Sequence, residues 1–133
     1  MERFDVLIVG GGQGGAEAAI ALRRLGFAGS VGIVSAEPDP PYERPPLSKD
    51  YLAGDKAFER MLIRPPAFWD ERAVALRLGR RVVGVRPEGR AVECQGGESF
   101  GYGRLIWAAG GEPFRLSCPG GDGANVHVIR SRA

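Results

Sequence analysis

The chain has 133 residues, the length of one ordinary domain, and 44% of them are apolar, which is enough for a packed core. The formal net charge of +2 is too small to indicate a nucleic-acid partner, and no apolar run approaches the length of a membrane span. Met1, Glu2 and Arg3 lead directly into the first strand without a signal peptide. We therefore expect a cytoplasmic protein that binds neither nucleic acid nor a membrane.

A glycine-rich loop follows the first predicted strand. Residues 6–9 read V-L-I-V, which predicts a strand buried on both faces, and residues 16–25 predict a helix. Between them Gly10, Gly12 and Gly15 fit G-x-G-x-x-G. The first glycine permits the turn, the second lets a pyrophosphate approach, and the third lets the helix pack on the strand. The loop therefore predicts a nucleotide site at the start of the helix.

A second apolar run, Val31–Val34, predicts the next parallel strand, and Glu37 follows it. A carboxylate just beyond this strand can accept hydrogen bonds from a ribose hydroxyl. The alternative is an ordinary surface glutamate, because Ser35 and Ala36 also lie at the strand end.

The proline-rich stretch 38–49 reads P-D-P-P-Y-E-R-P-P-L-S-K. Its prolines hold the chain extended, and Ser48 is a candidate N-cap for a short helix over residues 49–52. A stiff loop that fixes Arg44 and Lys49 suits an anionic or electron-rich ligand. The alternative is a solvated polar loop.

The later segments predict a short helix over residues 67–73, a return to the parallel sheet and an inserted antiparallel meander. Residues 126–130, V-H-V-I-R, alternate as an edge strand does. The other expected strands are 74–78, then the meander strands 82–85, Ala91–Cys94 and 99–102, and finally 104–108.

Cys94 and Cys118 lack a C-x-x-C pattern, so we expect two free thiols. No His, Cys or carboxylate cluster has the spacing of metal ligands, and the single histidine, His127, is expected to be structural.

Four segments resemble the N-terminal part of FAD-dependent ferredoxin reductases, which serve Rieske-type oxygenases and cytochromes P450. R-P-P-L-S-K is the most specific of them, because the related dithiol reductases place a C-x₄-C disulfide near this point. Apoptosis-inducing factor shares this signature and remains a relative. The segments read D-V-L-I-V-G-G-G-Q-G-G-A-E-A-A, P-Y-E-R-P-P-L-S-K-D-Y-L, L-I-W-A-A-G-G-E-P and V-H-V-I-R.

The resemblance implies a Rossmann-like α/β half-domain that binds FAD. NAD(P)H would be the electron donor and a [2Fe–2S] ferredoxin the acceptor. Glu37 would bind the adenosine ribose. The FAD pyrophosphate would lie against Gly10, Gly12, Gly14 and Gly15.

The same resemblance assigns residues beyond the glycine loop. Arg44 and Lys49 would lie on the flavin side, and Lys49 would be the catalytic residue. Val82 would meet the adenine through its backbone, Ala108 would lie near the adenosine half, and Arg130 would reach FAD from the end of its segment.

The chain also departs from the family pattern. Ala109 stands where A-T-G has its threonine, Phe114 stands where an arginine is common, and family members are much longer. Residues 1–133 are therefore expected to be a truncated N-terminal segment of an FAD-binding domain, without the NAD-binding and C-terminal domains. Such a segment would be inactive alone and prone to self-association. The alternatives are a non-catalytic nucleotide-binding fragment, an NAD-binding Rossmann domain and an apoptosis-inducing-factor-like NADH oxidoreductase.

Overall fold

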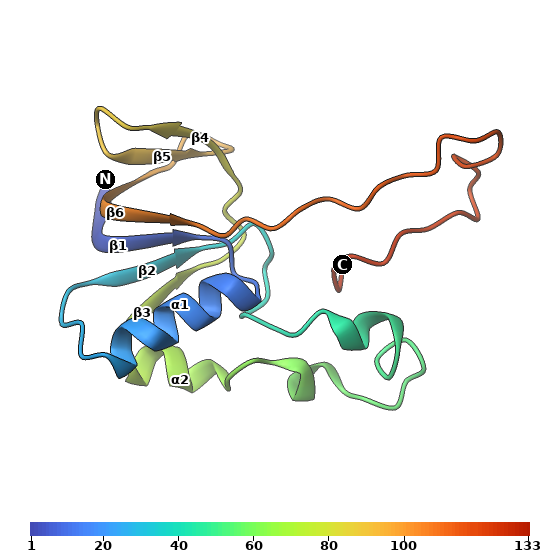
Figure 1. Cartoon of the computed structure of the whole chain (residues 1–133), viewed down its shortest axis with the longest axis horizontal. Coiled ribbons are helices and arrows are strands. Elements are labelled where there is room, and N and C mark those ends of the chain that lie inside the picture. The colour runs from blue at the N-terminus through green and yellow to red at the C-terminus, as the bar shows by residue number, and fades with distance from the viewer.

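One mixed β-sheet organises the molecule, which a computed structural model describes over all 133 residues (Figure 1). Its strands are β1 (Glu2–Val9), β2 (Val31–Val34), β3 (Val74–Arg77), β4 (Val82–Arg86), β5 (Ala91–Cys94) and β6 (Ser99–Trp107). They lie in the order β3-β2-β1-β6-β5-β4. β1 pairs in parallel with β2 and β6, β3 extends the parallel part, and β4 to β6 pair antiparallel. This confirms the predicted Rossmann-like α/β fold with an antiparallel meander.

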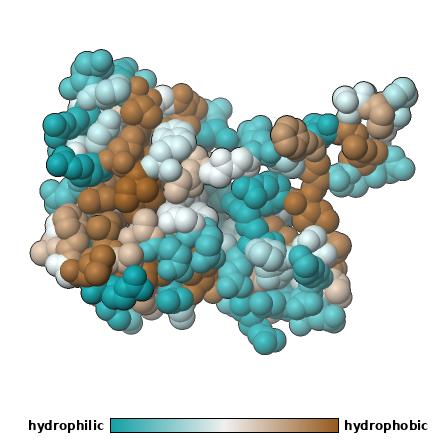
Figure 2. Space-filling model, in the orientation of Figure 1, coloured by the Kyte–Doolittle hydropathy of each residue, from teal (hydrophilic) through white to brown (hydrophobic).

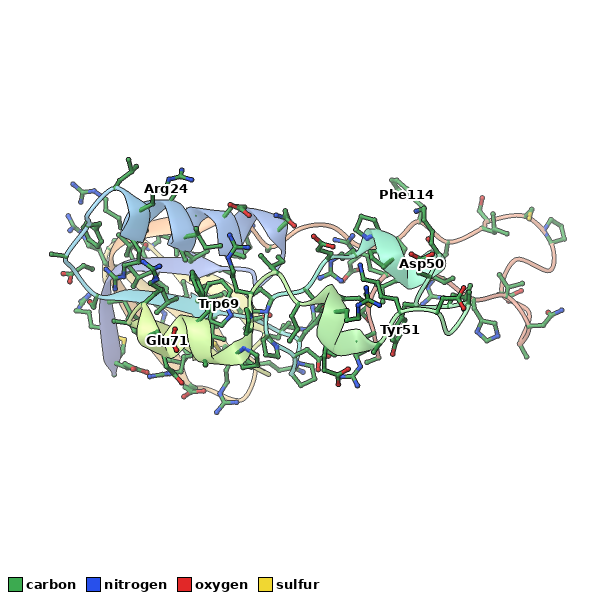
Figure 3. The ribbon with its side chains drawn as sticks, turned by 90° about the horizontal axis from the view of Figure 1, so that it is seen from below. Arg24, Asp50, Tyr51, Trp69, Glu71 and Phe114 are labelled. Carbon is green, nitrogen blue, oxygen red and sulfur yellow. The ribbon has the colours of Figure 1, made fainter.

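Two α-helices, α1 (Gln13–Arg24) and α2 (Pro66–Glu71), lie over the same face of the sheet (Figure 3). α1 contacts β1 and β2, and α2 contacts β3. α1 begins three residues earlier than the predicted 16–25, so that Gly14 and Gly15 belong to its first turn. The glycine loop between β1 and α1 is therefore very short.

β1 is buried on both faces, as its sequence predicts. Its alternate side chains enter two separate cores, with Val6 and Ile8 on the helix side and Leu7 and Val9 in the other core. Fully burying an aliphatic side chain of this kind stabilises the fold by about 1.5–3 kcal/mol. The helix-side core also contains Ala16, Ala19, Val31, Ile33, Trp69 and Val74. The other core also contains Phe4, Val34, Val92, Cys94, Phe100 and Tyr102.

The last strand corrects one prediction. Residues 99–102 and 104–108 were expected to be separate strands, but β6 runs unbroken through Gly103 and pairs with both β1 and β5. A Cβ at Gly103 would lie 2.8 Å from the carbonyl oxygen of Asp5. The glycine therefore permits close approach of β1 and β6 and does not mark a turn.

The helix predicted over residues 49–52 is also wrong. A 3-10 helix at Pro45–Ser48 comes before it, and turns follow through residue 54. Two prolines open this helix, where their fixed φ angles fit and their missing N–H groups are not needed. Lys49 ends it, and its N–H donates to the carbonyl oxygen of Pro46 at 3.0 Å. A second 3-10 helix covers Phe58–Met61.

No strand forms after Trp107, so the predicted edge strand over residues 126–130 is wrong as well. The tail leaves the end of β6, projects from the body and returns toward the proline-rich segment (Figure 1). Apolar side chains are exposed along it, including Phe114, Leu116 and Ile129 (Figure 2). Its alternating residues therefore pair with no sheet edge. Neither α-helix is long and apolar enough to cross a membrane.

Candidate functional site

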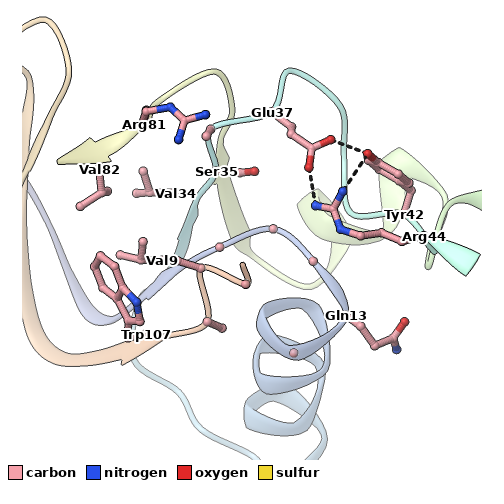
Figure 4. Close-up of a pocket in the computed structure, with 18 of the residues that line it drawn as sticks. Val9, Gln13, Val34, Ser35, Glu37, Tyr42, Arg44, Arg81, Val82 and Trp107 are labelled. Carbon is pink, nitrogen blue, oxygen red and sulfur yellow. Dashed lines mark hydrogen bonds and ion pairs between the residues drawn. The ribbon is translucent and has the colours of Figure 1, made fainter. Parts of the chain in front are cut away.

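A cavity of about 450 Å³ opens where the parallel strands end. Val9, Val34 and Trp107 are the last residues of β1, β2 and β6, and all three line it (Figure 4). Ligands of open α/β sheets bind at the carboxyl ends of the strands, where neighbouring connections leave in opposite directions. β1 lies at such a point, because β2 and β3 lie on one side of it in the sheet and β6, β5 and β4 on the other. The sequence-predicted residues that line the cavity are Gly10, Gly12, Gly14, Glu37, Arg44, Val82, Ala108 and Arg130.

The glycine loop occupies one wall of the cavity, and two of its glycines are required by the backbone itself. Gly10 has a φ of 115°, which other residues rarely adopt, and a Cβ there would overlap the carbonyl of Ala108. A Cβ at Gly15 would overlap the carbonyl oxygen of Gly10. Gly15 is therefore a packing residue behind the cavity and does not line it.

Gly12 differs from both, because a Cβ there would meet no atom within 4 Å. Its φ of −86° and ψ of −164° are also open to any residue. Nothing in the protein demands a glycine at this position. The open space in front of it faces the cavity, where a ligand can approach the backbone.

The amide groups at the start of α1 have no partners in the protein. The N–H groups of Gly12, Gln13 and Gly14 donate to no acceptor, and the first intrahelical donor is Ala16, which bonds to Gly12 at 3.0 Å. Unpaired N–H groups and the positive end of the helix dipole favour an anion. The loop therefore has the electrostatic character of a phosphate site.

Glu37 lies across the cavity from the glycine loop, within a network of polar side chains (Figure 4). Arg44 forms an ion pair with Oε1 of Glu37 and also donates to the hydroxyl of Tyr42 at 3.2 Å. The hydroxyl of Tyr42 donates to Oε2 of Glu37. The resemblance implied that Arg44 lies on the flavin side, whereas in the structure its guanidinium pairs with Glu37.

Tyr42 is only 3% exposed. Burial, together with the hydrogen bond to Glu37, raises the pKa of its hydroxyl above the ordinary value of 10.0. The hydroxyl therefore remains a proton donor at neutral pH. Glu37 is consequently held by one cationic and one neutral donor.

Lys49 lies outside this cavity. Its Nζ donates to the carbonyl oxygen of Pro45 at 3.3 Å, and its side chain forms no ion pair. At the other end of the chain, Arg130 reaches back to the cavity and donates to the carbonyl oxygen of Gly111 at 3.0 Å.

Three further lining residues were not predicted from the sequence. Trp107 is 57% exposed at the cavity, Arg81 precedes Val82 at its rim, and Tyr42 holds Glu37 (Figure 4). Their positions beside recognised motif residues were the available signal. An exposed tryptophan presents a flat apolar face on which a planar ring can stack.

The cysteines do not contribute to the site. Cys94 is buried and Cys118 is exposed, and both are free thiols. Burial raises the pKa of Cys94, which keeps it protonated and unreactive. No group of three or more potential ligand side chains is arranged to hold a metal ion.

Comparison with known proteins agrees with this geometry. The family of pyridine nucleotide-disulphide oxidoreductases matches residues 4–132. The chain belongs to this family. The matched residues include almost all of the sheet, both α-helices and the returning tail.

Among its relatives is a ferredoxin–NAD(P)(+) reductase from Sphingomonas sp, which is 57% identical over 130 residues, or 98% of this chain and 31% of the relative. The ferredoxin reductase subunit of 5,5'-dehydrodivanillate O-demethylase from Sphingobium sp. is 53% identical over 133 residues, or 100% of this chain and 32% of the relative. The chain thus spans about a third of the length of these relatives.

Solved structures show the same arrangement of elements. The ferredoxin reductase of the CYP199A2 system from Rhodopseudomonas palustris matches with a TM-score of 0.87 and 30% identity, over 96% of this chain and 31% of that one. The covalent complex of putidaredoxin reductase with putidaredoxin matches with a TM-score of 0.81 and 34% identity, over 87% of this chain and 27% of that one.

Proposed function

We propose that residues 1–133 form the N-terminal segment of an FAD-binding domain in an NAD(P)H-dependent ferredoxin reductase. The observation that carries the proposal is the single cavity that joins the glycine loop, Glu37 and Val82 at the carboxyl ends of the parallel strands. The names of the relatives support the reaction class, since both are ferredoxin reductases.

The residues present fit the adenosine diphosphate half of FAD. The unpaired N–H groups of Gly12, Gln13 and Gly14 would bind the pyrophosphate, and the space before Gly12 would admit it. Glu37 would accept hydrogen bonds from the ribose, because each carboxylate oxygen retains a free lone pair beside its present donor. Val82 and Ala108 would border the adenosine, and Arg130 would add a cation near the dinucleotide.

The bound flavin would supply the redox chemistry, accepting two electrons as hydride and releasing them singly. The protein would supply binding, orientation and charge. Lys49 would place a cation on the flavin side, outside the cavity at the strand ends. A [2Fe–2S] ferredoxin would receive the electrons in the full-length reductase.

Gly12→Val in the full-length protein tests this proposal. The branched side chain would fill the space of the pyrophosphate, yet its Cβ would meet no protein atom within 4 Å, so the fold should persist. We expect bound flavin per protein to fall at least about tenfold, or about 1.4 kcal/mol of binding free energy. Flavin absorbance measures this directly. The matched control is Gly89→Val, which introduces the same side chain in the β4–β5 turn, where a Cβ also has open space.

Three results would contradict the proposal. Undiminished flavin in folded Gly12→Val protein would exclude the glycine loop as the pyrophosphate site. A colourless wild-type protein that binds NADH would favour the NAD-binding Rossmann domain instead. A flavoprotein that oxidises NADH without reducing ferredoxin would favour the apoptosis-inducing-factor-like alternative.

A further inference from the structure

Both carboxylate oxygens of Glu37 are linked to the main chain of the returning tail, each through one side chain. Arg44 binds Oε1 of Glu37 and donates to the carbonyl oxygen of Arg130 at 2.6 Å. Tyr42 donates to Oε2 of Glu37 and accepts from the N–H of Arg132 at 3.0 Å. Two parallel bridges therefore join residue 37 to residues more than ninety positions later in the sequence.

The hydroxyl of Tyr42 is the centre of this arrangement. It contacts three groups at once, because it donates to Glu37 and accepts from Arg44 and from the N–H of Arg132. The ring below it is fixed by an edge-to-face contact with Phe58, whose centroid lies 5.3 Å away. A buried ring leaves the hydroxyl no freedom to turn toward water.

The tail makes further contacts beside this hydroxyl. The guanidinium of Arg132 lies 4.0 Å from the ring centroid of Phe58 and donates to Asp39 at 2.8 Å. Asp39, Tyr42 and Phe58 all belong to the segment between β2 and α2. The docked tail thus lies against the same segment that carries Glu37.

We propose that Tyr42 is a positioning residue of the nucleotide site, which orients the Glu37 carboxylate toward the ribose and docks the tail at residues 130–132 in the same step. The inference rests on the proposed function, since it takes Glu37 as the ribose ligand. Arg44 holds Oε1 of Glu37, and the Tyr42 hydroxyl holds Oε2, so that the orientation of the whole carboxylate is fixed before a nucleotide binds. Ribose recognition and tail docking are therefore coupled through this hydroxyl, in parallel with the bridge that Arg44 forms.

Tyr42→Phe tests the coupling, because it removes the hydroxyl and keeps the ring. In flavin-free full-length protein, affinities for ADP and 2′-deoxy-ADP report whether Glu37 recognises the ribose hydroxyl. We expect the wild-type preference for ADP to fall at least about threefold in the variant, as loss of one net hydrogen bond implies. The amide of Arg132 should also exchange with solvent at least about tenfold faster, because its acceptor is gone.

Tyr102→Phe is the matched control. Tyr102 is also buried and lies in β6, outside the cavity, and its hydroxyl forms no hydrogen bond. It should keep the wild-type nucleotide preference and exchange rate, which excludes a general effect of replacing a largely buried tyrosine by phenylalanine.

The proposal is overturned if Tyr42→Phe retains the wild-type preference for ADP or the wild-type exchange rate of the Arg132 amide. An equal loss of affinity for both nucleotides would also overturn it, because that result describes a purely structural residue. If wild-type protein itself shows no preference for ADP, Glu37 is not the ribose ligand, and the proposed site fails together with this inference.

Discussion

The buried hydroxyl of Tyr42 should titrate later than a free tyrosine. Burial and the hydrogen bond to Glu37 raise its pKa above 10.0, so the neutral form is favoured in the folded state. Its contribution to the free energy of unfolding is complete below the unfolded pKa and is lost as pH rises through the higher folded pKa. Ultraviolet titration of wild type against Tyr42→Phe should show the difference in phenolate absorbance only above pH 10.0. A difference that appears at lower pH would contradict the buried network.

Lys49 should act on the flavin through its charge. A cation near the flavin stabilises added electrons, so Lys49→Met in the full-length protein should lower the flavin midpoint potential and slow its reduction by NADH. Spectroelectrochemistry and stopped-flow absorbance measure the two effects. Lys56→Met, which removes the other lysine of the chain, is the control and should change neither. An unchanged midpoint potential and an unchanged rate of flavin reduction in Lys49→Met would contradict this role. Lys49 would then only end the 3-10 helix.

At the scale of the element, β6 depends on one close approach. Gly103 lies against β1, and a Cβ there would stand 2.8 Å from the Asp5 carbonyl oxygen, which is backbone and cannot rotate away. Gly103→Ala should therefore push β1 and β6 apart and lower the free energy of unfolding by about 1–3 kcal/mol. Urea unfolding measures the change. Gly89→Ala, where a Cβ meets no atom within 4 Å, should stay close to wild type, and equal midpoints for both variants would refute the argument.

Several elements show how much of the fold can be predicted from the sequence alone. The apolar run of β1, the glycine loop and the helix after it are local patterns, and the structure confirms them. Residues 99–102 and 104–108 were expected to be separate strands, because a glycine that permits close approach and one that opens a turn look identical without the partner strand. The prolines before Lys49 misled in a similar way, because they open a 3-10 helix where an extended segment was expected.

Many residues that line the cavity were predictable from the sequence, but the contacts between them were not. The cavity brings together eight of the residues named from the sequence, because each follows a strand or belongs to a recognised motif. The contact of Arg44 with the main chain of Arg130 spans 86 positions and depends on the path of the tail, which no periodicity encodes. Tyr42 was part of a quoted motif, but only the fold reveals that its hydroxyl faces Glu37.

At the scale of the whole molecule, the proposed nucleotide site has one glycine loop and one cavity at the strand ends. The remaining large pocket lies beside α2 and β3, is lined by residues such as Pro66 and Trp69, and has no glycine-rich turn. The indole N–H of Trp69 is buried there without a partner. The absence of a glycine-rich turn distinguishes this second pocket from the cavity at the strand ends.

Isolated as 133 residues, the chain should therefore show no NAD(P)H-dependent reductase activity. Hydride transfer needs the nicotinamide held about 3–3.5 Å from its acceptor atom in a fixed orientation, which requires a second nucleotide site beside the first. The only G-x-G-x-x-G in the sequence is already assigned to the FAD pyrophosphate. Mixing the purified chain with FAD, NADH and ferricyanide should give no turnover above that of free FAD, while the full-length protein serves as the positive control. Steady turnover by the chain alone would reveal a nicotinamide site among residues 1–133 and would overturn the assignment of this segment to FAD binding only.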